Sequence, residues 1–231
     1  MMEMRDLKLL GIDTSGKVAS VAVCDENTVI AQTTVVTKLT HSQIILPLCK
    51  EVLRLAETDL ADIDRIAVAD GPGSYTGLRI GISTVKGMAF ALGTECVGVS
   101  TLEALAHNLA GYDGTICAVM SARQSLVYAA EFRSDKNGIT RLTDDRIIEG
   151  EELAALLDGD IIFVGDYASE FVKKYGRDGF TVAPPHLRLQ LASGVCSAAM
   201  KKAPQKPEEI NARYLQPTKA EKDKQEEEKC S

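Results

Sequence analysis

The residues of this sequence that could do chemistry are few and widely spaced. The three histidines, His41, His107 and His186, form no H-x-x-x-H or H-E-x-x-H pair, the spacing that turns two imidazoles to one helix face for a metal ion. The six cysteines form no C-x-x-C pair. His41 precedes Ser42, and the pair either activates a nucleophile or starts a helix, with no carboxylate nearby in sequence to orient the imidazole. We predict no catalytic residue and no metal site.

A glycine-rich segment, DGPGSYTG (70–77), is the strongest candidate for ligand binding. It follows an apolar run and opens a helical pattern, and the free N–H groups of a helix N-terminus attract phosphate or carboxylate. The lysine of the Walker pattern is missing, so the segment predicts a nucleotide site only weakly. Asp13 and Thr14, at the turn between the first two predicted strands, either face the same phosphates or close the turn with their own hydrogen bonds. The candidate nucleotide contacts are Asp13, Thr14, Gly71, Gly73 and Ser74.

The helix predicted over 75–92 has glycines in its interior, where each costs roughly 1 kcal/mol relative to alanine. Gly77 and Gly81 are four residues apart and therefore share one face. A strip of small residues lets another helix approach closely. That helix belongs either to the same subunit or to a partner.

The helix predicted over 41–57 has an apolar face that is wider than one core requires, which indicates a second partner. We predict that both helices contact a partner protein, and that Gly81→Leu blocks the pairing while the fold survives. The predicted partner contacts are Ile44, Ile45, Leu48, Val52, Leu55, Gly77, Leu78, Gly81, Thr84, Val85 and Met88.

The order of predicted elements is β-β-β-α-β-α-β-α, and it occurs twice. The first set lies at 8–15, 18–25, 28–37, 41–57, 65–71, 75–92, 95–100 and 101–110. The second set lies at 115–122, 125–132, 138–149, 151–158, 161–166, 168–176, 180–185 and 189–202. Two such units describe the α/β fold of actin and the sugar kinases, whereas a doubly wound dinucleotide fold does not open with three strands. We predict this actin- and sugar-kinase-like fold, with duplicated βββαβα units and two lobes.

The predicted first lobe spans 1–100 and carries both partner helices. The second lobe spans 101–217, and its last helix is free to pack back on the first lobe. Residues 218–231 are dense in charge and nearly devoid of apolar side chains, which is typical of a disordered tail. A tail that binds a partner is the alternative.

The composition limits the partners. The 231 residues carry a formal net charge of -7, with no tryptophan and 5% aromatic residues. Proteins that bind RNA by themselves usually present a basic face, so we expect tRNA contact only through a complex. No apolar stretch reaches membrane-spanning length, and scattered cysteines are typical of a reducing compartment. We predict a cytoplasmic protein without membrane contact.

Several segments resemble the TsaB family, and they occur in the family's order from residue 9 to about 217. Two departures are Ser121, where the family usually has Asp, and Gln216, where it has Arg; Gln124 and Ser125 also replace a commonly charged pair. The segments that carry the resemblance are GIDTS (11–15), HSQIILP (41–47), DGPGSYTGLRIG (70–81), VGVSTLEALA (97–106), MSARQSLVYAAEF (120–132) and NARYLQP (211–217).

The resemblance implies a non-catalytic partner of TsaD, the paralogue that transfers threonylcarbamoyl to adenosine 37 of ANN-decoding tRNAs, with the ATPase TsaE completing the assembly. In that family the helices that match 41–57 and 75–92 face TsaD. The resemblance implies no cofactor, with ATP or ADP at the lobe cleft or at the complex interface as a weaker expectation. Two alternatives stay open: an actin-like kinase or glycoprotease-type enzyme, and a homodimeric binding module that uses the same helices.

Overall fold

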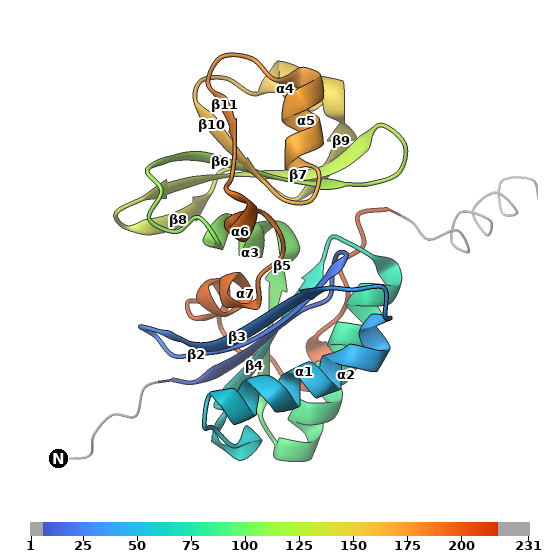
Figure 1. Cartoon of the computed structure of the whole chain (residues 1–231), viewed down its shortest axis with the longest axis vertical. Coiled ribbons are helices and arrows are strands. Elements are labelled where there is room, and N and C mark those ends of the chain that lie inside the picture. Colours follow the sequence, from blue (N-terminus) through green and yellow to red (C-terminus); the bar gives the residue numbers. More distant parts are fainter. Residues whose placement is uncertain (1–6, 217–231) are drawn as a thin grey trace, which may run out of the picture.

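The protein has two lobes, each built on one β-sheet, and a computed structural model describes residues 7–216 (Figure 1). The predicted tail 218–231 lies outside the described residues. In the first lobe five strands run in the order β3-β2-β1-β4-β5. β1 pairs antiparallel with β2 and parallel with β4. The strands are β1 (Leu9–Asp13), β2 (Val18–Cys24), β3 (Val29–Val36), β4 (Arg65–Gly71) and β5 (Glu95–Ser100).

Helices cover both faces of the first sheet. α1 (His41–Leu55) and α2 (Tyr75–Leu92) lie side by side on one face, where their apolar side chains join those of the strands in one core. Strand residues alternate between the two faces, so Leu10 and Ile12 point to this core while Leu9 points to the other face. α3 (Thr101–His107) and α7 (Ala192–Ala199) lie between the two sheets.

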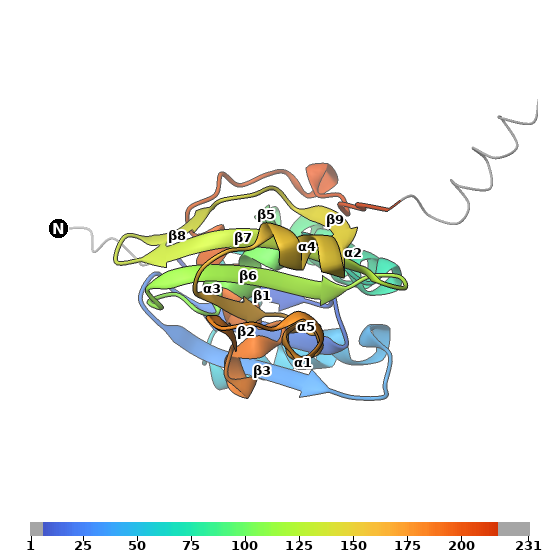
Figure 2. The ribbon, with the colours of Figure 1, turned by 90° about the horizontal axis from the view of Figure 1, so that it is seen from above.

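The second sheet has the order β11-β10-β6-β7-β8, and Figure 2 looks down on it with α4 and α5 above. The single strand expected over 138–149 is two strands, β8 and β9, which both pair with β7. Thr143 interrupts the ladder because its hydroxyl accepts the Glu131 N–H that a continuous strand would use. The remaining elements are β6 (Gly114–Ser121), β7 (Leu126–Asp135), β8 (Gly138–Arg141), β9 (Arg146–Glu149), α4 (Gly150–Leu156), β10 (Ile161–Val164), α5 (Ala168–Tyr175), β11 (Phe180–Val182) and α6 (Pro185–Arg188).

The chain crosses back to the first lobe after the second sheet is complete. α7 packs on the first sheet through Ala192, Val195, Cys196 and Ala199. The residues after α7 then follow the first lobe as far as Gln216, with a short 3₁₀ turn at Pro207–Glu209; a similar turn, Leu60–Asp62, precedes β4. The predicted second lobe, 101–217, therefore includes segments that lie on the first sheet. Among the described residues no helix has the length and apolarity needed to cross a membrane.

Candidate functional site

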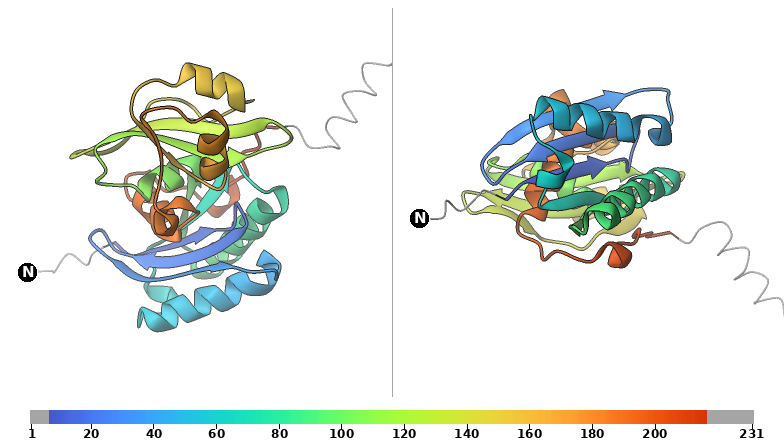
Figure 3. Two further views of the ribbon diagram at one scale, coloured as in Figure 1. Left: turned by 45° about the horizontal axis from the view of Figure 1, so that its top comes forward. Right: turned by 90° about the horizontal axis from the view of Figure 1, so that it is seen from below.

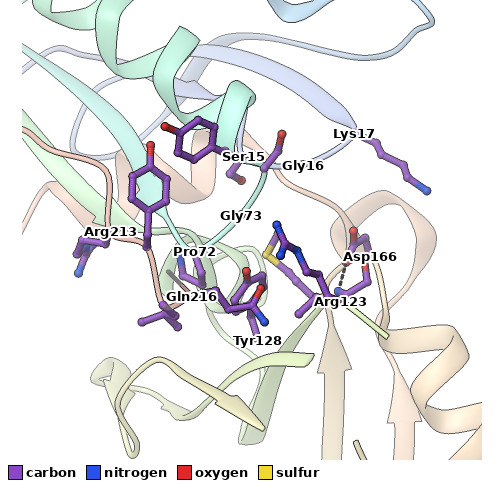
Figure 4. A pocket seen from close by; sticks show the side chains of 17 residues that line it. Ser15, Gly16, Lys17, Pro72, Gly73, Arg123, Tyr128, Asp166, Arg213 and Gln216 are labelled. Carbon is purple, nitrogen blue, oxygen red and sulfur yellow. Dashed lines mark hydrogen bonds between the residues drawn. The ribbon is translucent and has the colours of Figure 1, made fainter. Parts of the chain in front are cut away.

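A cleft of about 670 Å³ opens between the two lobes (Figure 4). The first lobe contributes the β1–β2 turn and the loop before α2, and the second lobe contributes the β6–β7 turn and the end of β10. The C-terminal segment supplies the remaining wall. The lining residues are 15–17, 72–75, 120–123, Tyr128, Asp166 and 213–216.

The β1–β2 turn is closed on itself. Asp13 has no solvent exposure, and its Oδ1 accepts hydrogen bonds from the Ser15 N–H at 2.8 Å and the Ser15 hydroxyl at 2.6 Å. Its Oδ2 has no hydrogen-bond partner. Burial raises the pKa of this carboxyl to about 6, against the lowering effects of the Ser15 bonds and of His41. Asp13 therefore does not line the cleft; it is the buried support of the turn.

Thr14 occupies the glycine strip of α2. Its hydroxyl donates to the Gly77 carbonyl at 2.7 Å. A β-carbon on Gly77 would collide with the Thr14 carbonyl oxygen, and one on Gly81 would collide with the Thr14 hydroxyl. The expectation that this strip receives a partner helix is wrong, because Thr14 of the same chain fills it. For the same reason we expect Gly81→Leu to destabilise the fold of the chain itself.

The loop before α2 packs directly on the β1–β2 turn. The Ser74 N–H donates to the Ser15 carbonyl at 2.7 Å, and the Ser74 hydroxyl caps α2 by accepting the Gly77 N–H. A β-carbon on Gly73 would also collide with Ser15. The turn and the loop are therefore in direct contact at Ser15, Gly73 and Ser74. Of the five candidate nucleotide contacts, Gly73 and Ser74 line the cleft.

The second-lobe side of the cleft carries groups that sequence analysis did not select. Asp166 Oδ1 accepts the Ser121 N–H at 3.0 Å, and burial raises the pKa of Asp166. Ser121, where the TsaB family usually has Asp, thus contributes its backbone N–H here. The Arg123 side chain points into the cleft in Figure 4, whereas Lys17 points away from it. Asp166 follows Gly165 at the end of a buried strand, and that Gly-Asp signal could have identified it.

The predicted partner contacts divide by burial into two groups. The side chains of Ile45, Val52, Leu78 and Val85 are buried in the core, together with Gly77 and Gly81, and so cannot reach a partner across the surface. Of the other five residues, Leu55 is exposed and four are partly buried. We call these five the α1–α2 face: Ile44, Leu48, Leu55, Thr84 and Met88.

Two of the three histidines, His41 and His107, make contacts that link neighbouring elements. His41 Nε2 lies 2.9 Å from the Gly16 carbonyl, which ties the start of α1 to the β1–β2 turn. His107 Nδ1 lies 2.9 Å from the Ser197 hydroxyl and so links α3 to α7, and burial lowers the pKa of His107 to about 4. Within residues 7–216, no three His, Cys, Asp or Glu side chains cluster in a way that could hold a metal ion.

Comparisons with known proteins match this chain to a TsaD family model and to proteins named TsaB. A family model described as "TsaD: tRNA N6-adenosine threonylcarbamoyltransferase" matches residues 28–224. The "tRNA threonylcarbamoyladenosine biosynthesis protein TsaB" of Escherichia coli is 36% identical over 68% of this chain and 64% of its own length. The protein of that name in Bacillus subtilis is 34% identical over 69% of this chain and 71% of its own length. The chain thus spans about two thirds of these relatives.

Solved structures agree with the sequence relatives. "YeaZ from Pseudomonas aeruginosa" superposes with a TM-score of 0.80 and 26% identity, covering 90% of this chain and all (100%) of that one. The ethanolamine utilization protein EutJ of Carboxydothermus hydrogenoformans, at 15% identity, has a TM-score of 0.53 over 84% of this chain and 91% of its own, and shares the fold alone. The predicted actin- and sugar-kinase-like fold is confirmed.

Proposed function

Since the chain belongs to the TsaB family, we propose that it acts in tRNA threonylcarbamoyladenosine biosynthesis as a subunit that performs no chemistry itself. In this proposal it binds the catalytic paralogue TsaD and supports transfer to adenosine 37 of ANN-decoding tRNAs, with TsaE joining through the complex. The relatives' names support the pathway. The geometry of this chain supports a partner-binding surface and a non-catalytic role.

The closed β1–β2 turn supports the non-catalytic part of the proposal. A phosphoryl-transfer enzyme needs a carboxylate and a phosphate clamp that meet in the cleft. Here Asp13 is fully buried and bonded to Ser15, and the Ser74 loop packs on the same turn. Asp166, whose carboxylate lines the cleft, accepts a hydrogen bond from the Ser121 N–H. These contacts favour the non-catalytic proposal over the kinase alternative.

The α1–α2 face is the observation that carries the partner-binding part. Ile44, Leu48 and Leu55 follow one another at spacings of four and seven residues, so they form one stripe along α1. Leu55 keeps 53% of its side chain exposed. On α2, Thr84 and Met88 are also four residues apart. Ile44 and Leu48 are partly buried, and Leu48 packs against the core, so the exposed apolar surface of this stripe is greatest at Leu55. Exposed apolar surface along a helix is typical of one that packs against another subunit.

Replacement of one leucine tests this assignment. Leu55 and Leu156 are both the last residue of a helix, α1 and α4, and both are highly exposed, at 53% and 63%. We expect Leu55→Glu to weaken binding to the organism's own TsaD at least tenfold, because a charge would be buried without a partner, at a cost of about 1–3 kcal/mol or more. Leu156→Glu, on the second lobe, should bind as the wild type does. Titration calorimetry measures both.

Size-exclusion chromatography of the same proteins distinguishes the homodimer alternative. If the chain dimerises through the α1–α2 face, Leu55→Glu turns a dimer into a monomer even when TsaD is absent. If wild type and both variants form no complex with TsaD, the partner proposal is rejected. Equal binding by Leu55→Glu and Leu156→Glu would move the interface to another surface.

A further inference from the structure

The last described residues, 205–216, form an arm that runs along the first lobe beside α2 (Figure 3). Its start pairs with the edge of β5, where Cys96 and Gln205 exchange backbone hydrogen bonds at 2.9 and 2.7 Å. Farther on, the Lys86 ammonium of α2 donates to the Glu208 carbonyl at 3.3 Å. Ile210 is buried in the core beneath α2. The arm is therefore an integral part of the first lobe.

Arg213 fastens the arm to the loop that leads into α2. Its backbone N–H donates to the Asp70 carbonyl at 2.7 Å, and its Nε donates to Asp70 Oδ1 at 2.8 Å. The Asp70 side chain is 11% exposed, so it pairs with Arg213 in a partly desolvated setting. A β-carbon on Gly71 would collide with the Arg213 carbonyl oxygen. Loop and arm are thus in direct backbone contact.

Tyr214 contacts the first turn of α2. Its ring lies 5.0 Å from the Tyr75 ring, centroid to centroid, and its hydroxyl accepts a hydrogen bond from Arg79 Nε at 3.1 Å. The Arg79 guanidinium lies over the Tyr75 ring at 4.2 Å. These three side chains form a clasp that joins the arm to residues 75 and 79, on the flank of α2 away from the core.

The first turn of α2 is exposed on its outer side, at residues 74–76. Gly71, Gly73 and Gly77 lie within seven residues, and each glycine adds backbone freedom that folding must remove. From inside, the turn is held by Ser74 and Thr14. From outside, Tyr75 is 41% exposed, and its ring contacts are with Arg79 and Tyr214. Without the clasp, the helix end would fray.

We propose that Arg213 and Tyr214 are positioning residues that set the loop and first turn of α2, and thereby the orientation of the helix that binds the partner. This inference rests on the proposed function, because it assigns the arm a role in TsaD binding. Arg213 and Tyr214 act through α2; neither belongs to the α1–α2 face. The arm also lines the cleft, so the same two residues connect the cleft wall to the partner helix.

Hydrogen exchange and partner affinity, measured on the full chain, test the proposal together. In Tyr214→Ala and Arg213→Ala we expect the amides of residues 73–79 to exchange about tenfold faster, while the rest of the first lobe keeps its protection. Affinity for TsaD should fall about fivefold or more. Tyr214→Phe keeps the ring and should recover most of the affinity. Glu208→Ala is the matched control on the same arm, because the contact of Glu208 with Lys86 uses the backbone carbonyl.

The outcomes separate this inference from the proposed function. If wild type does not bind TsaD, the proposed function falls, and the inference falls with it. If wild type binds and the variants exchange faster but bind equally well, the inference alone is overturned. Unchanged exchange at residues 73–79 overturns it as well. Should one alanine variant lose its whole fold, Tyr214→Phe and Arg213→Lys give graded losses that still decide the question.

Discussion

At the scale of single residues, Asp13 shows how a position typical of catalysis becomes structural. The residue stands at the end of β1, where a free carboxylate could face a phosphate. In this chain the carboxyl is buried, and Ser15 satisfies one of its oxygens twice. The sequence predicts the turn and its Asx-type bond, since Asp13 precedes Ser15 by two residues. It could not predict the burial, because that depends on loop 71–74 from a different part of the chain.

Asp13 should make stability depend on pH. A carboxyl whose pKa is raised to about 6 by folding binds its proton more tightly in the folded state. This contribution therefore favours folding below about pH 4 and is lost as the pH rises through about 6. We expect Asp13→Asn to be more stable than wild type at pH 7, by about 1–3 kcal/mol, with the difference disappearing near pH 4. Urea unfolding at several pH values measures it, and a constant difference would contradict the assignment.

At the scale of elements, local sequence patterns predict where the strands and helices lie along the chain. They do not predict which face of each helix is buried. The bounds of α2 are those predicted, because Ser74 caps its start and Gly93 ends it in a left-handed conformation. Which of its glycines faces inward could not be read from spacing alone. Thr14 fills the strip at Gly77 and Gly81, while Gly87 faces open space. The wide apolar face of α1 predicts partner contacts. Of the residues predicted there, only Ile44, Leu48 and Leu55 are not buried in the core.

Substitutions at two glycines of α2 test which face of this helix is buried. Gly81→Leu should destabilise the protein by about 3 kcal/mol, because its side chain would displace Thr14 from a packed site. Gly87→Leu, on the same helix, should instead stabilise it by about 0.5–1 kcal/mol, since leucine is the better helix former and nothing lies within 4 Å of its β-carbon. Thermal or urea unfolding measures both. Equal effects of the two substitutions would contradict the placement of Thr14.

At the scale of the whole molecule, the fold was predictable because the order of elements repeats, and the sequence motifs lie where the TsaB family has them. The sequence already allows the last helix, α7, to pack back on the first lobe, where the helix lies. The sequence does not predict the return of the arm, since contacts such as Asp70 with Arg213 join residues 143 positions apart. Tyr214 lines the cleft because the arm returns to the first lobe. The proposed partner surface, by contrast, combines two helices that are neighbours in space and are separated in sequence by a single strand, β4, and a short 3₁₀ turn.

The central claim is that this chain supports TsaD without doing chemistry. The most direct measurement is a reconstituted transfer reaction with purified TsaD, TsaE, an ANN-decoding tRNA and threonylcarbamoyl adenylate, followed by mass spectrometry of the nucleosides. We predict modified adenosine when TsaD and this chain are both present, a strong loss when the chain is omitted or carries Leu55→Glu, and none from the chain alone. Product from the chain alone, or full activity of TsaD without it, would contradict the account.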